Sequence, residues 1–429
     1  MEYIYNKRLD EGYYKEILEN GLTVFVYPMR NKSSVYAMLS AKVGSTMLSY
    51  ELNGEEYNVP EGVAHFLEHK LFENEDGVDA FSLFALTGAS ANAYTSFDKT
   101  CYLFEASIEP EQSLRTLIRF VNSPYFTKET VAKEQGIIAQ EIKMYRDHPS
   151  WRQLFELFKL MYSTHPIKNE IAGTVESIGE ITPKILYNFY NTFYNPTNMV
   201  LAVSGNIEPE TVLEICREEY TNKTEQNVKF VAKRYDDNNS IPEKRIVIDM
   251  PISAPQFCYG FKEIPFKEDE KVKKGLIFEM LLDIMCGQTS KLFRELYDGN
   301  LINDILSAEI YSSKDYQCAI FSAESSNPNR VIEAINMEID RLKSEGIDKE
   351  LFEECKRAYI GEIIGDFEDV TSVATGLTYS HFNDAGIYDL LSVIEEVELN
   401  DMQLLLNEVL RSDMSAAALV FPSSGESEE

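Results

Sequence analysis

The chain has 429 residues, 44% of them hydrophobic, which is too long for one ordinary core and favours two or more domains. Acidic residues outnumber basic ones by 71 to 40, and the formal net charge of -31 disfavours binding to nucleic acid or to anionic lipid. No run of about 18 apolar residues occurs and the start lacks the pattern of a signal peptide, so we expect no membrane span and no secretion. Six cysteines without C-x-x-C spacing favour free thiols and a cytoplasmic location.

The first half of the chain alternates strand and helix patterns. Asn20-Gly21 is a turn signal between two opening strands. Alternating and apolar runs predict strands at 22–27, 35–45, 101–106 and 199–204. Helical spacing predicts a helix around residues 65–69, and others near 78–87, 110–122 and 128–146, between 150 and 192, and near 208–218.

A polar stretch separates this half from a second one of similar style. Residues 222–244 are rich in Asn, Lys, Asp and Glu, which predicts a linker. It would join a first domain at 1–221 to a second at 245–429. In the second half the patterns predict strands at 256–261, 304–311, 317–323 and 415–421, and helices near 268–287, 328–345 and 349–365.

The most informative motif lies at residues 65–69, which read His-Phe-Leu-Glu-His. His65 and His69 are four apart, so on a helix their side chains lie one above the other and can bind the same metal ion. Glu68 lies beside them, within reach of a water molecule on that ion. This H-x-x-E-H pattern is typical of metal-assisted hydrolysis.

A third ligand is available in the helix predicted at 128–146. Catalytic zinc usually has three protein ligands and a water molecule. Glu134 and Glu141 are seven apart, about two turns, so their carboxylates project from the same face. One could bind the metal while the other hydrogen-bonds a ligand imidazole. The alternative is that both are solvated on an exposed face.

Taken together, these motifs resemble the pitrilysin/insulinase-type zinc metallopeptidases, the family that includes the mitochondrial processing peptidase. The order of further segments agrees with it: Gly-Ala-Ser-Ala-Asn-Ala-Tyr-Thr-Ser at 88–96, His-Pro at 165–166, Gly-Thr-Val-Glu-Ser-Ile at 173–178 and Tyr-Asn-Pro-Thr-Asn-Met at 194–199.

The resemblance implies both a fold and a set of roles. The fold would be α+β, with two homologous α/β domains, each a mostly antiparallel sheet packed with helices, and only the first would bind metal. His65, His69 and Glu141 would be the zinc ligands. Glu68 would be the general base, and Glu134 a supporting catalytic residue. The function implied is that of a zinc-dependent endopeptidase.

The segment 88–107 has a separate chemical interpretation. Apolar and polar positions alternate from Ala91 to Phe97, as in a strand, and a peptide could pair with the strand if its edge is free. The resemblance assigns Asn92 and the backbone of Ala93 to substrate contact. The alternative is an internal strand whose small residues permit close packing.

The second half departs from the family pattern. Members carry a segment like S-x-L-F-x-x-L-R-E-K-x-G-L-A-Y, whose Arg and Tyr approach the active site, and the Tyr can stabilise an oxyanion. Aligned on Ser290 and Phe293, Tyr297 stands where Arg is expected and Asp304 where Tyr is expected. Arg294 is out of register. The resemblance therefore favours a heterodimer in which a homologous, metal-free partner chain supplies the pair. The alternative is a monomer or homodimer in which another residue fills that role.

Several functional questions stay open at this level. The substrate would be a short unstructured peptide, either one particular peptide that is matured or peptides that are turned over generally. The acidic excess would favour basic peptides, or it only keeps the chain in solution. A different class of function is a non-catalytic structural or binding subunit of a complex, although such relatives typically lack ligands of the zinc motif.

Overall fold

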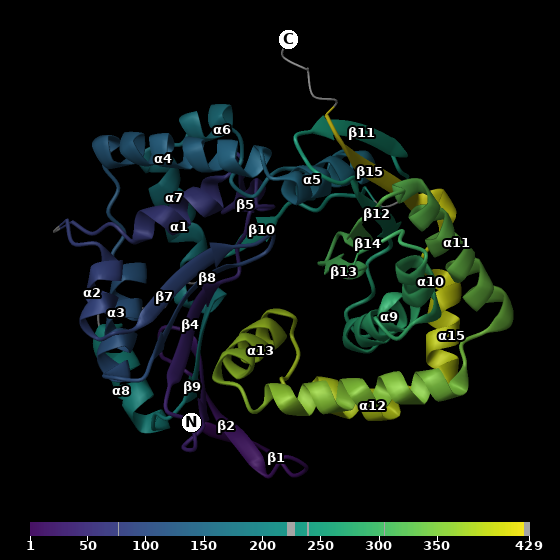
Figure 1. The fold of residues 1–429 in the computed structure, drawn as a ribbon. Coiled ribbons are helices and arrows are strands. Elements are labelled where there is room, and N and C mark those ends of the chain that lie inside the picture. The colour runs from purple at the N-terminus through teal and green to yellow at the C-terminus, as the bar shows by residue number, and fades with distance from the viewer. Residues whose placement is uncertain (76, 221–227, 238–239, 304, 424–429) are drawn as a thin grey trace. The chain divides into compact units, whose positions relative to one another are not determined.

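The structure is a computed structural model that describes residues 1–75, 77–220, 228–237, 240–303 and 305–423. The chain forms two compact units, and each takes segments from both halves of the sequence (Figure 1). The first unit comprises residues 1–142, 170–233 and 364–388, and the second comprises residues 143–169, 234–363 and 389–429. The domains predicted at 1–221 and 245–429 are continuous segments, whereas the compact units are not. The first unit also includes residues 364–388, which follow the predicted linker, and the second also includes residues 143–169, which precede it.

The first unit is built on a seven-stranded sheet in which only β3 and β9 run parallel. Every residue of the two central strands β4 and β9 is buried, because helices cover both faces of the sheet. At the ends of the sheet, β1 and β7 each pair with a single neighbour. The strand order is β1 (Glu2–Asn6), β2 (Glu11–Ile17), β3 (Thr23–Pro28), β9 (Met199–Gly205), β4 (Val35–Ala41), β8 (Thr100–Ala106) and β7 (Ser90–Thr95).

Helices from distant parts of the sequence cover the two faces of this sheet. Side chains of successive strand residues point to opposite faces. On β7, Thr95 contacts the helix α1 (Val63–Leu71), whereas Tyr94 contacts α13 (Val370–Phe382). The face that bears α1 also carries a large apolar core under α2 (Ala80–Leu86), α3 (Pro110–Val121), α4 (Lys128–Arg146), α6 (Val175–Gly179), α7 (Pro183–Phe193) and α8 (Pro209–Glu219).

The second unit repeats this construction on a five-stranded sheet. Only β11 and β15 run parallel, and α5 (Pro149–Met161), from the first half of the sequence, packs on β12 and β15. The strand order is β11 (Arg245–Met250), β15 (Ser415–Pro422), β12 (Gln256–Glu263), β14 (Gln317–Glu324) and β13 (Ser307–Ser312). The other helices are α9 (Lys271–Cys286), α10 (Lys291–Asp298), α11 (Pro328–Glu345), α12 (Lys349–Asp366), α14 (Asp389–Glu396) and α15 (Leu399–Glu408).

The predicted fold class is confirmed: helices and mostly antiparallel sheets make two domains of the same style. Among the described residues, no helix is both long enough and apolar enough to cross a lipid bilayer.

The described part of the predicted linker is tied to the rest of the chain at two points. Residues 221–227 and 238–239 lie outside the described residues. Strand β10 (Phe230–Ala232) pairs with β5 (Ser49–Leu52), which in turn pairs with β6 (Glu55–Asn58). Further along, Asp237 is buried in the second unit.

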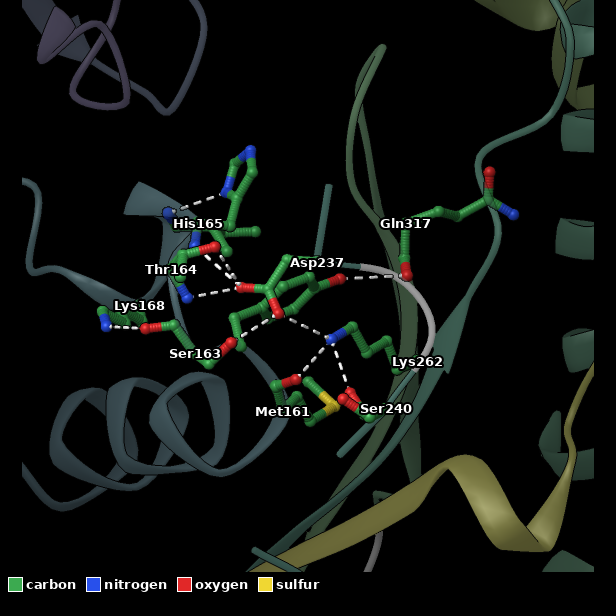
Figure 2. A network of polar contacts seen from close by, with 11 residues as sticks. Met161, Ser163, Thr164, His165, Lys168, Asp237, Ser240, Lys262 and Gln317 are labelled. Carbon is green, nitrogen blue, oxygen red and sulfur yellow. Dashed lines mark hydrogen bonds and ion pairs between the residues drawn. The ribbon is translucent and has the colours of Figure 1, made fainter. Parts of the chain in front are cut away.

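Asp237 holds the chain against the loop that follows α5 (Figure 2). Its carboxylate accepts hydrogen bonds from the backbone N–H groups of Thr164 (2.6 Å) and His165 (2.8 Å) and from the hydroxyl of Ser163 (2.8 Å). The ammonium group of the fully buried Lys262 lies 3.4 Å from it. Burial alone would raise the pKa of Asp237, but these hydrogen bonds and the lysine hold the pKa well below its usual range.

Lys262 is held by backbone acceptors as well as by Asp237. Its Nζ donates to the carbonyl oxygens of Met161 (2.6 Å) and Ser240 (2.8 Å) (Figure 2). Burial lowers the pKa of Lys262, and Asp237 offsets part of this effect. A buried charge that loses its partner is costly, so the stability of this region depends on the pair remaining intact.

We therefore predict that Asp237→Ala destabilises the second unit by about 3 kcal/mol, because it leaves two backbone donors without their acceptor and the buried Lys262 without its charged partner. Fluorescence of the single tryptophan, Trp151 in α5, can follow urea unfolding of this unit. Asp236→Ala is the matched control, because Asp236 is adjacent to Asp237 and carries the same charge but is exposed. Equal midpoints for the two variants would contradict the assigned role of Asp237.

Candidate metal centre

The helix α1 begins at a position that only glycine fits well. Gly62 precedes it with φ of 85°, in the left-handed region, and a Cβ there would lie 2.3 Å from the carbonyl oxygen of Ala172. The apolar residues of α1 are buried in the core of the first unit, which fixes the rotation of the helix about its axis. His65 and His69 then lie on one side, with ring centroids 4.6 Å apart.

The helix α4 brings two carboxylates to these imidazoles. The Nε2 atom of His65 lies 3.6 Å from Oε1 of Glu141, and Nε2 of His69 lies 3.4 Å from Oε2 of the same residue. On the other side of the His69 ring, Nδ1 lies 3.0 Å from Oε1 of Glu134. His65, His69 and Glu141 each offer one potential ligand atom, and these three atoms lie within 4.8 Å of one another.

These distances fit a zinc ion. Zinc bonds of about 2.0–2.1 Å in tetrahedral geometry place neighbouring ligand atoms about 3.3 Å apart. The two distances from imidazole nitrogen to Glu141 are close to this value. The contact of Glu134 with Nδ1 of His69 favours a proton on Nδ1, which leaves the lone pair of Nε2 for a metal. Nδ1 of His65, by contrast, is buried and accepts or donates no hydrogen bond among the described residues.

Glu68 is buried beside the two histidines. Its Oε2 accepts a hydrogen bond of 2.6 Å from the hydroxyl of Thr95. Burial raises the pKa of the Glu68 carboxyl, and the neighbouring imidazoles and Thr95 offset part of this rise. Burial opposes the charged form of His69, but the hydrogen bond with Glu134 and the nearby carboxylates raise the pKa of this imidazole above its ordinary value.

The strand β7 passes the site at one end of the sheet. It pairs with β8 alone, so among the described residues its other side carries no strand. Asn92 is exposed on β7, and its Oδ1 accepts a hydrogen bond of 2.9 Å from the backbone N–H of Ala93. An extended peptide could add to this side, with a peptide carbonyl replacing the Asn92 side chain as the acceptor.

Two models of one peptidase family match this chain. The family model described as Insulinase (Peptidase family M16) matches residues 26–175, and the one described as Peptidase M16 inactive domain matches residues 180–359. A Bacillus subtilis protein named Uncharacterized zinc protease YmfH is 36% identical over 427 residues, which cover 97% of this chain and 98% of that protein. The chain belongs to the insulinase family, peptidase family M16.

Solved structures of this family have the same fold. An M16-like peptidase from Alicyclobacillus acidocaldarius is 31% identical, with a TM-score of 0.93, over 96% of this chain and 98% of that one. The periplasmic protease PqqL from Escherichia coli is 20% identical, with a TM-score of 0.75. The match covers 97% of this chain but 48% of PqqL, so PqqL is about twice as long. The resemblance inferred from the sequence is thus confirmed.

The M16 segment expected to carry Arg and Tyr forms α10. Ser290 caps the helix, with its hydroxyl accepting a hydrogen bond from the N–H of Phe293. Tyr297, at the position expected for Arg, is 51% exposed. Asp304, at the position expected for Tyr, lies outside the described residues.

Another tyrosine of the second half of the sequence, Tyr379 in α13, belongs to the first unit but does not fill this role. Its hydroxyl lies 2.7 Å from that of Tyr94. Because Tyr94 and Thr95 point to opposite faces of the sheet, Tyr379 lies on the face opposite Glu68.

The structure also shows what sequence reasoning missed. Thr95 contacts Glu68, although 27 residues separate the two, and no local spacing indicates this contact. His165 of the His-Pro pair caps the short turn that follows it: its Nδ1 accepts a hydrogen bond from the N–H of Ile167, and its Nε2 lies 3.2 Å from Asp315.

We predict that Glu134→Gln weakens zinc binding by about ten- to hundredfold, because the amide holds the His69 imidazole less well than the carboxylate does. Competition with a chelator of known affinity measures this change. Glu129→Gln is the control, because it removes an exposed carboxylate from the same helix. Equal affinities of the two variants would show that the His69 orientation does not depend on Glu134.

Proposed function

We propose that this chain is a zinc-dependent endopeptidase that hydrolyses short unstructured peptides. The observation that carries the proposal is the convergence of His65, His69 and Glu141 at distances that fit tetrahedral zinc. Membership of the M16 family and the naming of relatives as zinc proteases support it. The complete ligand set argues against a purely structural subunit.

In this proposal each residue has a distinct task. Zinc bound by His65, His69 and Glu141 would supply a Lewis acid and lower the pKa of a water molecule. Glu68 would take a proton from that water as its oxygen adds to the carbon of the scissile carbonyl. Glu68 would then pass the proton to the amide nitrogen as the C–N bond breaks, so one water molecule is consumed and one peptide bond is lost.

The substrate would bind in an extended conformation along β7. Backbone pairing with a sheet edge holds a peptide largely independently of its side chains, which suits substrates of varied sequence. Asn92 and the N–H of Ala93 would be the contacts at this edge. A folded protein would not expose such a stretch of backbone, so short or unfolded peptides are the expected substrates.

The missing Arg/Tyr pair favours a second chain. We infer that a homologous, metal-free partner supplies a donor to the oxyanion formed at the scissile carbonyl. Support comes from the exposed Tyr297 at the expected Arg position and from PqqL, which is about twice as long as this chain. A cytoplasmic location belongs to the same proposal and is supported by six buried cysteines, all of them free.

The first test is cleavage of a mixture of unstructured peptides by the purified, zinc-loaded chain, alone and with candidate homologous chains lacking the zinc motif. We predict that Glu68→Gln lowers kcat by at least about a hundredfold while zinc content stays unchanged, because it removes the group that moves the proton. Glu105→Gln, an exposed residue of β8, is the control and should behave as wild type.

The same experiment tests the partner. We predict that the chain alone cleaves at least about a hundredfold more slowly than the mixture with its partner, because the oxyanion then lacks its donor. Full activity of the chain alone would rule out the need for a partner. Absence of cleavage under every condition, with zinc bound, would contradict the proposed enzyme itself.

A further inference from the structure

The hydroxyl of Thr95 makes a short, buried contact with the general base. Its Oγ1 donates a hydrogen bond of 2.6 Å to Oε2 of Glu68, and the two residues are 9% and 7% exposed. Thr95 is the last residue of β7, and it points to the face of the sheet on which α1 lies. This contact joins the strand to the helix that carries the histidines.

Such a contact restricts a side chain that is otherwise free to rotate. Glutamate has three rotatable bonds, whereas a β-branched threonine in a strand has few χ1 options. A hydrogen bond from a hydroxyl to a charged carboxylate is also stronger than one between neutral groups. The orientation of Glu68 is therefore set by a rigid neighbour rather than by its own torsions.

The contact also makes the two carboxylate oxygens unequal. Oε2 accepts the hydrogen bond from the threonine hydroxyl. In the proposed peptidase, the other oxygen, Oε1, would then be the one better placed to exchange a proton with a water molecule or a leaving amine. A base that presents one defined oxygen needs no reorganisation during the reaction.

We propose that Thr95 is a positioning residue that fixes the Glu68 carboxylate and so couples the base to the strand that binds substrate. This inference rests on the proposed peptidase function. Thr95 lies two residues from Ala93 on the same strand, so one rigid segment would set the register of the peptide and the orientation of the base. In this role the threonine would act through Glu68 and not by contact with the substrate or the metal.

The test compares Thr95→Val, which keeps the shape and strand preference of threonine, with Thr95→Ser, which keeps the hydroxyl. We expect Thr95→Val to lower kcat by about tenfold or more, with KM and zinc content unchanged, and Thr95→Ser to restore most of kcat. Steady-state kinetics on one peptide, together with metal analysis, gives these values.

Thr100→Val is the matched control. Thr100 is directly opposite Thr95 on β8, is fully buried and donates a hydrogen bond of 2.9 Å to the carbonyl oxygen of Val43. Its loss should lower the melting temperature without lowering kcat. Equal losses of kcat in Thr95→Val and Thr100→Val, or no rescue by serine, would overturn the proposal.

A structural measurement separates this inference from the proposed function. Crystal structures of zinc-loaded wild type and Thr95→Val should show the Glu68 carboxylate in one orientation in the former and rotated or in several conformers in the latter. An unchanged carboxylate in Thr95→Val would overturn the role of Thr95 even if the chain has no peptidase activity. If the wild type cleaves no peptide but the Glu68 carboxylate still moves in Thr95→Val, the proposed function is wrong and the positioning role of Thr95 stands.

Discussion

The packing of α4 against α1 depends on how the charge of three neighbouring carboxylates is offset. Glu68 and Glu134 are buried and Glu141 is partly exposed, all beside two imidazoles. In a medium of low polarity such a group of acids is unfavourable unless cations or hydrogen-bond donors compensate it. Thr95 donates to Glu68, and Nδ1 of His69 contacts Glu134. Glu141 faces the Nε2 atoms of both histidines, and a divalent cation would satisfy all three groups together.

The grouping of His65, His69 and Glu141 in the structure was expected from the sequence, because the spacing within each helix is a local property. The intervals of four residues in α1 and seven in α4 are properties of single helices, which local periodicity fixes. The predicted helix at 128–146 has the bounds observed for α4, and the helix predicted at 110–122 differs from α3 by one residue. What joins α1 to α4 is chemistry rather than spacing: two histidines need a further anionic ligand, and α4 offers one.

Contacts between distant segments were beyond the sequence argument. The region after α12 received no predicted helix, although α13, α14 and α15 lie there. The buried residues of α13 do lie on one side of the helix, at positions 370, 373, 374, 377, 378 and 382, but an alanine and a threonine among them make this stripe only weakly apolar in the sequence. Helix α5 comes from the first half of the sequence but belongs to the second unit, and α13 comes from the second half but belongs to the first unit. No local pattern in the sequence indicates this, because it depends on which sheet face each helix covers in the folded chain.

The strand β7 links these separate features because its two faces have different partners. Toward α1 it presents Thr95, and toward α13 it presents Tyr94, whose hydroxyl contacts that of Tyr379. Lys99 lies 4.4 Å from the centroid of the Tyr379 ring, a cation–π contact that adds to the same attachment. An edge strand with one hydrogen-bonded neighbour is ordinarily the least restrained part of a sheet. Here contacts on both faces hold it in place, while no strand among the described residues pairs with its outer side.

The role of α13 bears on what counts as a domain in this chain. All residues of β4 and β9 are buried, and α13 packs on both strands. A fragment that ends at residue 221 would expose the apolar side chains on that face of the sheet and would lose the Tyr94–Tyr379 contact. Burial of such surface contributes about 25 cal/mol per Å², so the loss of a whole helix from a sheet face amounts to several kcal/mol. The first unit therefore needs a segment from the second half of the sequence. That segment contributes directly to the stability of β7, the strand that carries Thr95 and Tyr94.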